Sequence, residues 1–303
     1  MPVLEPPSPV SSVGTRRATA SRLRHLAVRQ TRRLGCPRQT VQVDGSLPGG
    51  VANAGQVIRQ GHSVLRPSNP NSTSIHKFLT ALRGTGFKGA SLPVEIQSDG
   101  RERLNFIEGD VPIPPYPEWA QSNDTLASVA LLMLEFHRAS ALVVADLQTW
   151  SDELADASGG PIVCHNDVCM ENVVFRNGVA IGLLDFDFAA PGRPLYDLAQ
   201  FARMCVPIDD DMSAERLGWN ITDNPTRLRL VTDAYGLAAE ARQDLIECLD
   251  RSMNRGEDFV RRRVAAGDPN FIRMLKEMGG IERYERRRAW WESRRGEFVA
   301  ALV

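Results

Sequence analysis

Short apolar runs separated by turn residues predict that the first third of the chain is rich in β-strands. Turns are expected at Gln60-Gly61 and Asp99-Gly100, because glycine accepts the positive φ of tight hairpin turns. The segment 72–83 instead carries apolar residues at helical spacing. The pattern predicts a five-stranded antiparallel sheet with one helix. The candidate strands are 41–43, 56–58, 63–65, 94–96 and 104–107.

From residue 119 onward the apolar pattern is mainly helical. The stretch 126–147 is interrupted by Glu135, Arg138 and Asp146, which favours an amphipathic core helix over a membrane span. The arginine-rich end, 281–298, interleaves Glu with Arg and predicts a solvated helix face with ion pairs, whereas Trp290 and Trp291 should pack inward. Helices are expected at 124–145, 195–205, 226–238, 241–265 and 270–302.

One hairpin interrupts these helices. Asn177-Gly178 lies between two apolar runs, which is the strongest short signal for a type I′ turn. Counting outward pairs Arg176 with Val179 and places Asn172 opposite Leu183. Asp185 lies just past that pair, so an amide and a carboxylate are expected together at the open end of the hairpin.

The residues around this hairpin match the parts of a phosphoryl-transfer site. His165-Asn-Asp167 is followed by four residues and Asn172, and Asp185-Phe-Asp187 follows the second strand. An aspartate can take the proton of an attacking hydroxyl, while an asparagine and a second aspartate can hold Mg²⁺. Asp and Asn near a hairpin are often only turn formers or caps. The combination of spacing and strand–turn–strand context favours the chemical interpretation.

The segment 159–199, GGPIVCHNDVCMENVVFRNGVAIGLLDFDFAAPGRPLYDLA, resembles the core of the aminoglycoside phosphotransferase and choline-kinase-like family. The likeness extends more weakly from about residue 45 to the late helices. It implies an α+β, protein-kinase-like fold of two lobes. The N-terminal lobe would be a small antiparallel β-rich unit, and the C-terminal lobe would be larger and mainly helical.

The resemblance also implies a role for each matching residue. Asp167 would be the catalytic base, and Asn172 and Asp185 would be metal ligands. His165 would hold the catalytic loop. Asp187 would either assist the metal or brace the loop. A further match, Asp197, would anchor the catalytic loop from a helix start, with Tyr196 and Leu198 in the core.

Nucleotide contacts are expected in the β-rich part. Gly49, Gly50 and Asn53 lie between the first two strands, in the family's phosphate-loop position, although Gly-Gly alone is usually just a turn. Glu108 lies in a Phe-Ile-Glu-Gly segment that resembles the family's hinge, where backbone groups would meet the adenine edge.

The expected lysine–glutamate ion pair is missing from the sequence. Arg66 stands where the family has lysine, and the helix 72–83 has no acidic residue, with His76 near the glutamate position. The usual ion pair is therefore not expected to form. Arg66 still offers a forked, permanently charged donor for phosphates.

The function expected from this resemblance is transfer of phosphate from ATP or GTP, with Mg²⁺, to a hydroxyl of a small molecule. Aminoglycoside-like compounds, amino alcohols and sugars are all possible acceptors. A nucleotide-binding pseudoenzyme or regulatory protein is the alternative that the missing ion pair favours. A protein-serine kinase is disfavoured, because no activation loop follows Asp185. Acidic residues either line a pocket for a cationic acceptor or form an exposed loop and helix cap: Asp209, Asp210, Asp211, Glu215 and Asp223.

Composition and net charge bear on which kinds of partner the protein binds. The 303 residues are 43% hydrophobic and 24% charged with a net charge of −1, which suggests neither nucleic acid nor a membrane as partner. The 5 cysteines show no zinc spacing, and no secretory signal is evident, which fits the cytoplasm.

Residues 16–38 are basic and free of Asp and Glu, so 1–38 is expected to be a disordered extension, a transit peptide or a nucleic-acid arm. The chain is thus expected to divide into three parts. They are the N-terminal extension 1–38, a nucleotide-binding lobe 39–108, and a catalytic and substrate-binding lobe 109–303.

Overall fold

The structure is a computed structural model that describes residues 44–47, 53, 55–143, 149–220 and 223–303. Residues 43–303 form one compact unit. The basic segment 1–38 and the predicted strand 41–43 lie outside the described residues. The division at residues 38 and 108 stays a prediction.

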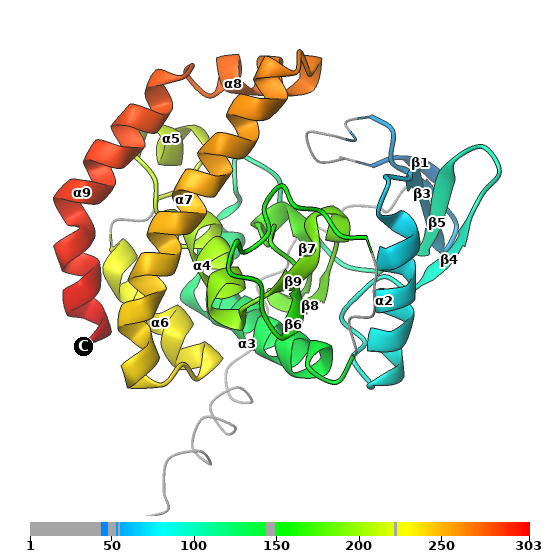
Figure 1. The fold of residues 1–303 in the computed structure, drawn as a ribbon, viewed down its shortest axis with the longest axis horizontal. Helices are drawn as coiled ribbons and strands as arrows, with labels where there is room; N and C mark the ends of the chain where they lie inside the picture. Colours follow the sequence, from blue (N-terminus) through cyan, green and yellow to red (C-terminus); the bar gives the residue numbers. More distant parts are fainter. Residues whose placement is uncertain (1–43, 48–52, 54, 144–148, 221–222) are drawn as a thin grey trace, which may run out of the picture. The chain divides into compact units, whose positions relative to one another are not determined.

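The predicted five-stranded antiparallel sheet is confirmed, with strand order β1-β2-β3-β5-β4 (Figure 1). Gly61 (φ 58°) and Gly100 (φ 82°) supply the positive φ that its hairpin turns need. The strand boundaries differ by up to three residues from those expected. The strands are β1 (Asp44–Ser46), β2 (Ile58–Gln60), β3 (Ser63–Pro67), β4 (Pro93–Ile96) and β5 (Arg101–Asn105).

The one helix of this region, α2 (Ser72–Gly84), buries the predicted apolar stripe against the rest of the molecule. Ile75, Phe78, Leu79 and Leu82 are each at most 4% exposed. The Phe78 ring meets Phe136 edge-on at 6.3 Å between centroids. Fully burying one such side chain contributes about 1.5–3 kcal/mol, so this stripe fixes the helix in place.

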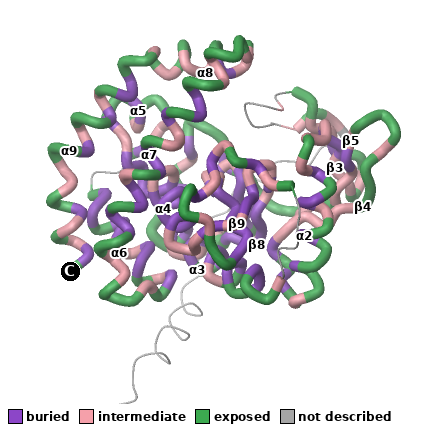
Figure 2. The backbone as a smooth tube through the Cα atoms, viewed as in Figure 1, coloured by how far each residue is buried: buried purple, intermediate pink, exposed green. Residues whose placement is uncertain are grey.

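The remaining chain is mainly helical, as predicted. The long helices are α3 (Asn123–Ser140), α4 (Pro194–Cys205), α6 (Asn224–Tyr235), α7 (Arg242–Ala265) and α9 (Glu282–Leu302). A short helix, α5 (Asp211–Arg216), was not expected. Helix α3 is the centre of the core, with Val129, Met133 and Phe136 fully buried (Figure 2). None of the described helices is long and apolar enough to cross a membrane.

The prediction of a single helix over 270–302 is wrong. The segment forms α8 (Pro269–Glu277) and then α9. Gly279 (φ 87°) and Gly280 (φ 75°) adopt the left-handed conformation between the two helices. A left-handed residue ends an α-helix, so the glycine pair lets the chain change direction here.

Two small two-stranded sheets lie among the helices, and the second is a hairpin. β6 (Ile162–Cys164) pairs with β9 (Ala190–Gly192), and β7 (Val173–Arg176) pairs with β8 (Val179–Leu183). The predicted turn is confirmed, with Asn177 at φ 54° and Gly178 at φ 76°, and Arg176 pairs with Val179. The predicted pairing of Asn172 with Leu183 is wrong: Val173 faces Leu183. A register shift between Val174 and Phe175 accounts for the error, since a β-bulge inserts one residue into one strand.

Candidate active site

The loop that carries Asp167 leaves the fully buried strand β6 and is held by α4. Asp197, in the first turn of α4, accepts hydrogen bonds from two successive backbone amides of the loop. Its Oδ2 lies 2.7 Å from His165 N, and its Oδ1 lies 2.8 Å from Asn166 N. Asn166 has φ 63°, a strained value that these two bonds help to maintain. The predicted anchoring of the loop by Asp197 is confirmed, as is the burial of Tyr196 and Leu198.

Two residues that the sequence analysis did not single out support Asp197. His137 Nε2 on α3 lies 3.0 Å from Asp197 Oδ2, and His137 Nδ1 lies 2.7 Å from the Tyr235 hydroxyl of α6. Burial opposes ionisation of Asp197, but the hydrogen bond and charge of His137 hold the pKa of this carboxyl below its usual value. The loop is thus tied to α3, α4 and α6 together.

His165 joins the loop that carries Asp167 to the segment that precedes Asp185. Burial lowers its pKa, so the ring is neutral and carries one N–H. Its Nε2 lies 2.8 Å from the carbonyl oxygen of Leu184, which can only accept, so Nε2 is the donor. Its Nδ1 then accepts from Asp167 N at 3.3 Å. The ring also packs on Phe186 at 4.5 Å between centroids.

Asp167 and Asn172 lie side by side, as the spacing predicted. Asn172 Nδ2 donates to the Asp167 backbone oxygen (2.9 Å) and to Asp167 Oδ2 (3.2 Å). This orientation leaves Asn172 Oδ1 as the atom that a metal could use. Asp167 forms no ion pair with any residue in the described part of the chain. Although it retains some accessible surface, desolvation by the surrounding protein and the charge of Asp185 raise its pKa well above the usual value.

Asp185 lies at the end of β8 in a left-handed conformation with φ 61°. Such a conformation costs about 1–3 kcal/mol for a residue other than glycine, and the buried Phe186 next to it holds the backbone in place. The carboxylates of Asp185 and Asp187 both face Arg66 of β3. Arg66 Nη1 lies 2.7 Å from Asp185 Oδ1, and Nη2 lies 2.6 Å from Asp187 Oδ1.

The usual ion pair with a helix glutamate does not form, as expected, but Arg66 has a glutamate partner that the sequence analysis did not anticipate. Glu102 supplies the carboxylate, from β5 rather than from a helix, with Oε1 2.5 Å from Arg66 Nε. The two residues are directly paired across β3 and β5. His76 of α2 lies 2.7 Å from the other oxygen of Glu102. Burial opposes ionisation of Glu102, but the His76 hydrogen bond and the charge of Arg66 keep its pKa below the usual value.

The Arg66 cluster is short of positive charge. Glu102, Asp185 and Asp187 share one guanidinium, which is the only arginine among these ion pairs. Burial, together with the charge of Asp185, raises the pKa of Asp187 to about 7. Oxygen donors with excess negative charge suit Mg²⁺. Within the described residues no three His, Cys, Asp or Glu side chains are grouped to hold a metal. A metal site here would therefore need the Asn172 amide oxygen as a ligand besides the carboxylates of Asp185 and Asp187.

The residues expected to contact nucleotide are only partly described. Gly49 and Gly50 lie outside the described residues, and Asn53 stands in a turn where its carbonyl accepts from Gln56 N. The expected hinge is attached to the catalytic hairpin: Asp110 and Phe175 exchange backbone hydrogen bonds of 2.7 and 2.8 Å. Glu108 pairs with Arg59 of β2 at 2.5 Å.

Arg59 was missed by the sequence analysis. Its guanidinium lies 3.8 Å from the centre of the Phe106 ring, and its Nη1 is buried without a hydrogen-bond partner. Strand alternation could have indicated its orientation, because Arg59 pairs with Val64, two residues before Arg66. An unpartnered buried N–H beside the expected hinge is the kind of group that a ligand can satisfy.

The acidic segment does not form an open anionic pocket. Asp209 pairs with Arg283, and Asp210 caps α5 and pairs with Arg286 at 3.4 Å. Asp211 accepts from Trp290 Nε1 at 3.1 Å, whereas Glu215 is exposed and Asp223 caps α6. The expectation of a solvated α9 face is therefore wrong in part, since its arginines reach across to other segments. Arg283 and Arg287 are buried, and Trp291 packs inward as expected.

Comparisons with known proteins identify the family of this chain. Residues 50–231 match the phosphotransferase enzyme family. The trifolitoxin immunity protein of Rhizobium leguminosarum bv. trifolii is 31% identical over 199 residues, which cover 64% of this chain and 75% of the relative.

Solved structures share the fold. A choline/ethanolamine kinase family protein from Mesorhizobium loti superposes with a TM-score of 0.57 at 15% identity, covering 86% of this chain and 92% of the other. The streptomycin–ATP–APH(2")-IIa ternary complex gives a TM-score of 0.51 at 14% identity, covering 80% and 93%. At such identities the likeness concerns the fold alone. Since the family match spans most of the chain, the protein belongs to the phosphotransferase enzyme family, a family of small-molecule kinases.

Proposed function

We propose that this protein transfers the terminal phosphate of ATP or GTP to a hydroxyl of a small molecule. The observation that carries the proposal is the convergence of Asp167, Asn172 and Asp185 at one end of the β7–β8 hairpin, opposite Arg66. Such a reaction needs positioning and charge neutralisation more than covalent chemistry, and these four side chains supply both.

Asp167 is the general base. Its carboxylate has no cationic partner among the described residues, so it is free to accept the proton of the acceptor hydroxyl. The bond from Asn172 Nδ2 to Oδ2 orients the carboxylate, and His165 holds the loop on which it lies. Asp197 holds the same loop in place by accepting hydrogen bonds from the backbone amides of His165 and Asn166.

Asp185 and Asn172 Oδ1 are the proposed ligands of Mg²⁺, with Asp187 either assisting them or bracing the loop. When bound, Mg²⁺ would neutralise charge on the nucleotide phosphates. The excess of carboxylates over cations around Arg66 supports this assignment, since a divalent cation would compensate it.

Arg66 replaces the usual lysine and Glu102 positions it. Glu102 bonds only to Nε of the guanidinium, whereas the two Nη groups bond to Asp185 and Asp187. The Nη groups can therefore turn to phosphate oxygens while Glu102 keeps the arginine in place. Arginine suits this task because its fork of donors matches phosphate oxygens.

The nucleotide base lies against the segment Phe106–Gly109, with Glu108 and Arg59 beside it. Gly49, Gly50 and Asn53 hold phosphates through their backbone amides. Support comes from the named contents of the similar structures: one was solved with ATP, and another with GDP and kanamycin. ATP and GTP therefore both remain candidates for the phosphate donor.

The acceptor is an alcohol of the aminoglycoside, amino-alcohol or sugar type. A second candidate comes from the 31% identical relative, whose name specifies immunity to the toxin trifolitoxin. A kinase that phosphorylates a toxin hydroxyl would supply such immunity, and so would a nucleotide-binding relative that only sequesters the toxin. Catalytic turnover distinguishes the two.

The test is Asp167→Asn, assayed for phosphate transfer and for nucleotide binding. Loss of a general base lowers turnover by about 10²–10⁴-fold. We expect that loss with nucleotide affinity unchanged, because Asp167 touches neither Arg66 nor the hinge. If Asp167→Asn transfers phosphate as fast as the wild type, the assignment is wrong. If the wild type and Asp167→Asn both bind nucleotide and neither transfers phosphate to any alcohol, the sequestration function is favoured.

A further inference from the structure

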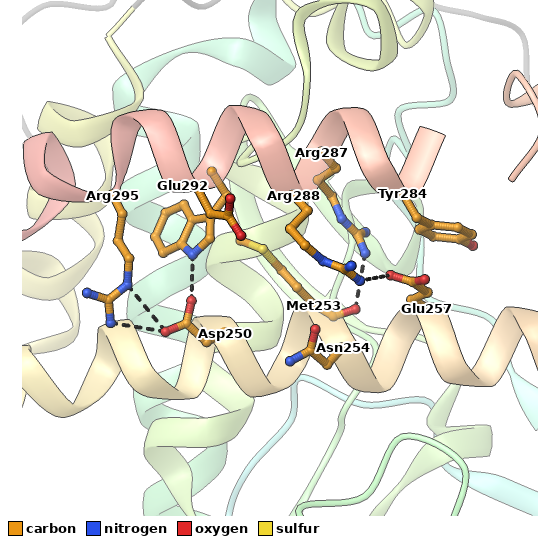
Figure 3. Close-up of a pocket in the computed structure, with 10 residues that line it drawn as sticks. Asp250, Met253, Asn254, Glu257, Tyr284, Arg287, Arg288, Glu292 and Arg295 are labelled. Atoms are coloured by element: carbon orange, nitrogen blue, oxygen red, sulfur yellow. Dashed lines mark hydrogen bonds and ion pairs between the residues drawn. The ribbon is translucent and has the colours of Figure 1, made fainter. Parts of the chain in front are cut away.

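Three arginines meet beneath the catalytic loop, where α4, α7 and α9 pack together. Arg203 comes from α4, and Arg283 and Arg287 come from α9; they are called here the arginine cluster. Arg203 and Arg287 reach the same turn of α7. Arg203 Nε donates to Ser252 Oγ at 3.0 Å. Arg287 Nη2 donates to the Met253 carbonyl at 3.1 Å, the bond drawn in Figure 3.

The arginine cluster contains more positive charge than its surroundings neutralise. Asp209 pairs with Arg283. Neither Arg203 nor Arg287 forms an ion pair with any residue that the structure describes. The partners of Arg203 are the neutral Ser252 and Gln200. Arg287 has a backbone carbonyl and the Tyr284 ring, 5.1 Å away.

This arrangement is unfavourable unless an anion joins it. Arg287 is 4% exposed, and the negative charge that favours its cationic form is that of Asp209, which is already paired with Arg283. A buried cation that is only partly compensated in this way is destabilising. Burial and the nearby charge of Arg203 lower the pKa of Arg287 to about 10. The neighbouring Arg288, by contrast, is exposed and pairs with Glu257 at 3.2 Å (Figure 3). Arg288 is thus neutralised by a carboxylate of α7, whereas Arg287 on the same helix has no such ion pair.

A glycine on α7 keeps Arg203 uncovered. Gly256 lies in the interior of a 24-residue helix, where glycine costs about 1 kcal/mol relative to alanine. A Cβ atom at this position would lie 3.5 Å from Arg203 Nη2 and 3.6 Å from Cζ. Any longer side chain there would cover the guanidinium.

The arginine cluster is close to the proposed catalytic base. The Sγ of Cys205, two residues beyond Arg203, lies 3.8 Å from the carbonyl oxygen of Val168, which directly follows Asp167. The charge of Arg203 acts on Asp167. Both residues keep part of their surface accessible. An acceptor with its hydroxyl at Asp167 would therefore extend toward Arg203.

We propose that the acceptor carries a carboxylate or phosphate group, which the arginine cluster binds while the hydroxyl lies at Asp167. This inference rests on the proposed phosphate transfer to an alcohol, and it favours an acidic alcohol, such as an acidic sugar, over the cationic aminoglycosides and amino alcohols. Either acidic group presents paired oxygens to a guanidinium fork. A cationic acceptor would meet arginine here, because the carboxylates of Asp209 and Asp210 are already paired.

The test compares four three-carbon alcohols on the full chain in the presence of Mg²⁺ and ADP. Glycerate carries a carboxylate, glycerol 3-phosphate a phosphate, glycerol no charge and 2-amino-1,3-propanediol a positive charge. Melting temperature is measured at equal concentration and ionic strength, since a ligand that binds only the folded state raises it. We expect at least one anionic compound to raise it by about 2–4 °C and the other two compounds to have no effect.

Variants locate the binding site. Arg203→Met should abolish the anion-dependent shift, and Arg203→Lys should retain part of it because the charge remains. Arg288→Met is the matched control and should keep the full shift, since Arg288 lines the same cavity of about 320 Å³ as Arg287 but is already paired. Equal shifts from all four alcohols in the wild type would overturn the proposal, whatever the variants do. So would an undiminished anion shift in Arg203→Met.

The same experiment separates this inference from the proposed function. The shift produced by Mg²⁺ and ADP alone reports the nucleotide site. If that shift is present and the anionic alcohols do nothing, only the acidic acceptor is wrong. If that shift is absent, the proposed function fails, and the anion arm still decides whether the arginine cluster binds acidic groups.

Discussion

At the scale of single residues, the Arg66–Glu102 pair shows where sequence reasoning ended. Arg66 and His76 depart from the family pattern, and the usual ion pair with a helix glutamate was not expected because α2 has no acidic residue. Glu102 restores the pair from the neighbouring strand. That substitution depends on the register between β3 and β5, which no short motif encodes. The motif residues Asp167, Asn172 and Asp185 were found because their spacing is local.

Asp197 is the residue whose charge should govern acid stability. Its folded-state pKa lies below the unfolded value of about 3.9. A lowered carboxyl pKa contributes stability that is fully present above the unfolded pKa and is lost as pH falls through the folded pKa. Asp197→Asn should therefore reduce the free energy of unfolding by about 3–5 kcal/mol at neutral pH, because it breaks a buried pair.

Denaturant unfolding between pH 3 and 7 checks this prediction. The difference between wild type and Asp197→Asn should be largest at neutral pH and should shrink below about pH 4. Asp233→Asn is the control, since that carboxylate is half exposed and its ion pairs lie at the surface. Its effect should stay within about 1 kcal/mol. A pH-independent difference for Asp197→Asn would show that its charge is not the stabilising property.

At the scale of elements, turns were predictable and register was not. Asn177-Gly178 specified its hairpin through two left-handed residues, which is a local signal. The bulge in the same hairpin shifted Asn172 by one position, because bulges depend on what the strands pack against. The break between α8 and α9 was readable in Gly279-Gly280 but was outweighed by the continuous helical pattern around it.

Gly109, in the segment after β5, lies against β7 of this hairpin and should not tolerate a side chain. A Cβ atom there would lie 2.4 Å from the carbonyl oxygen of Phe175 and 2.5 Å from a methyl group of Val174. Gly109→Ala should push the expected hinge away from β7 and destabilise the protein by about 1–3 kcal/mol, as overpacking does. Thermal unfolding should show a melting temperature lower by about 2–4 °C per kcal/mol.

The matched control is Gly296→Ala in α9, where a Cβ atom would meet nothing within 4 Å. Because alanine is the better helix former, this variant should be stabilised by about 0.5–1 kcal/mol. A Gly109→Ala protein as stable as Gly296→Ala would mean that the close approach of residue 109 to β7 is not needed.

At the scale of the whole molecule, a net charge of −1 hides a strong separation of charge. Carboxylates gather around Arg66 on the proposed metal side of the site, and arginines gather around Arg203 on the proposed acceptor side. The partners in both clusters are far apart in sequence: Arg66 and Asp185 are separated by 119 residues, and Arg283 and Asp209 by 74. Composition cannot reveal such sorting, and only the fold brings the partners together.

The central claim is that Asp185 belongs to a metal-dependent nucleotide site. The most direct measurement is the melting temperature with ATP and with GTP, each with and without Mg²⁺, for wild type, Asp185→Ala and the exposed control Asp233→Ala. We predict a Mg²⁺-dependent rise with at least one nucleotide, since a ligand at 100 times its Kd adds about 2.7 kcal/mol. The rise should persist in Asp233→Ala and disappear in Asp185→Ala. No rise with either nucleotide, or an undiminished Mg²⁺-dependent rise in Asp185→Ala, would contradict the claim.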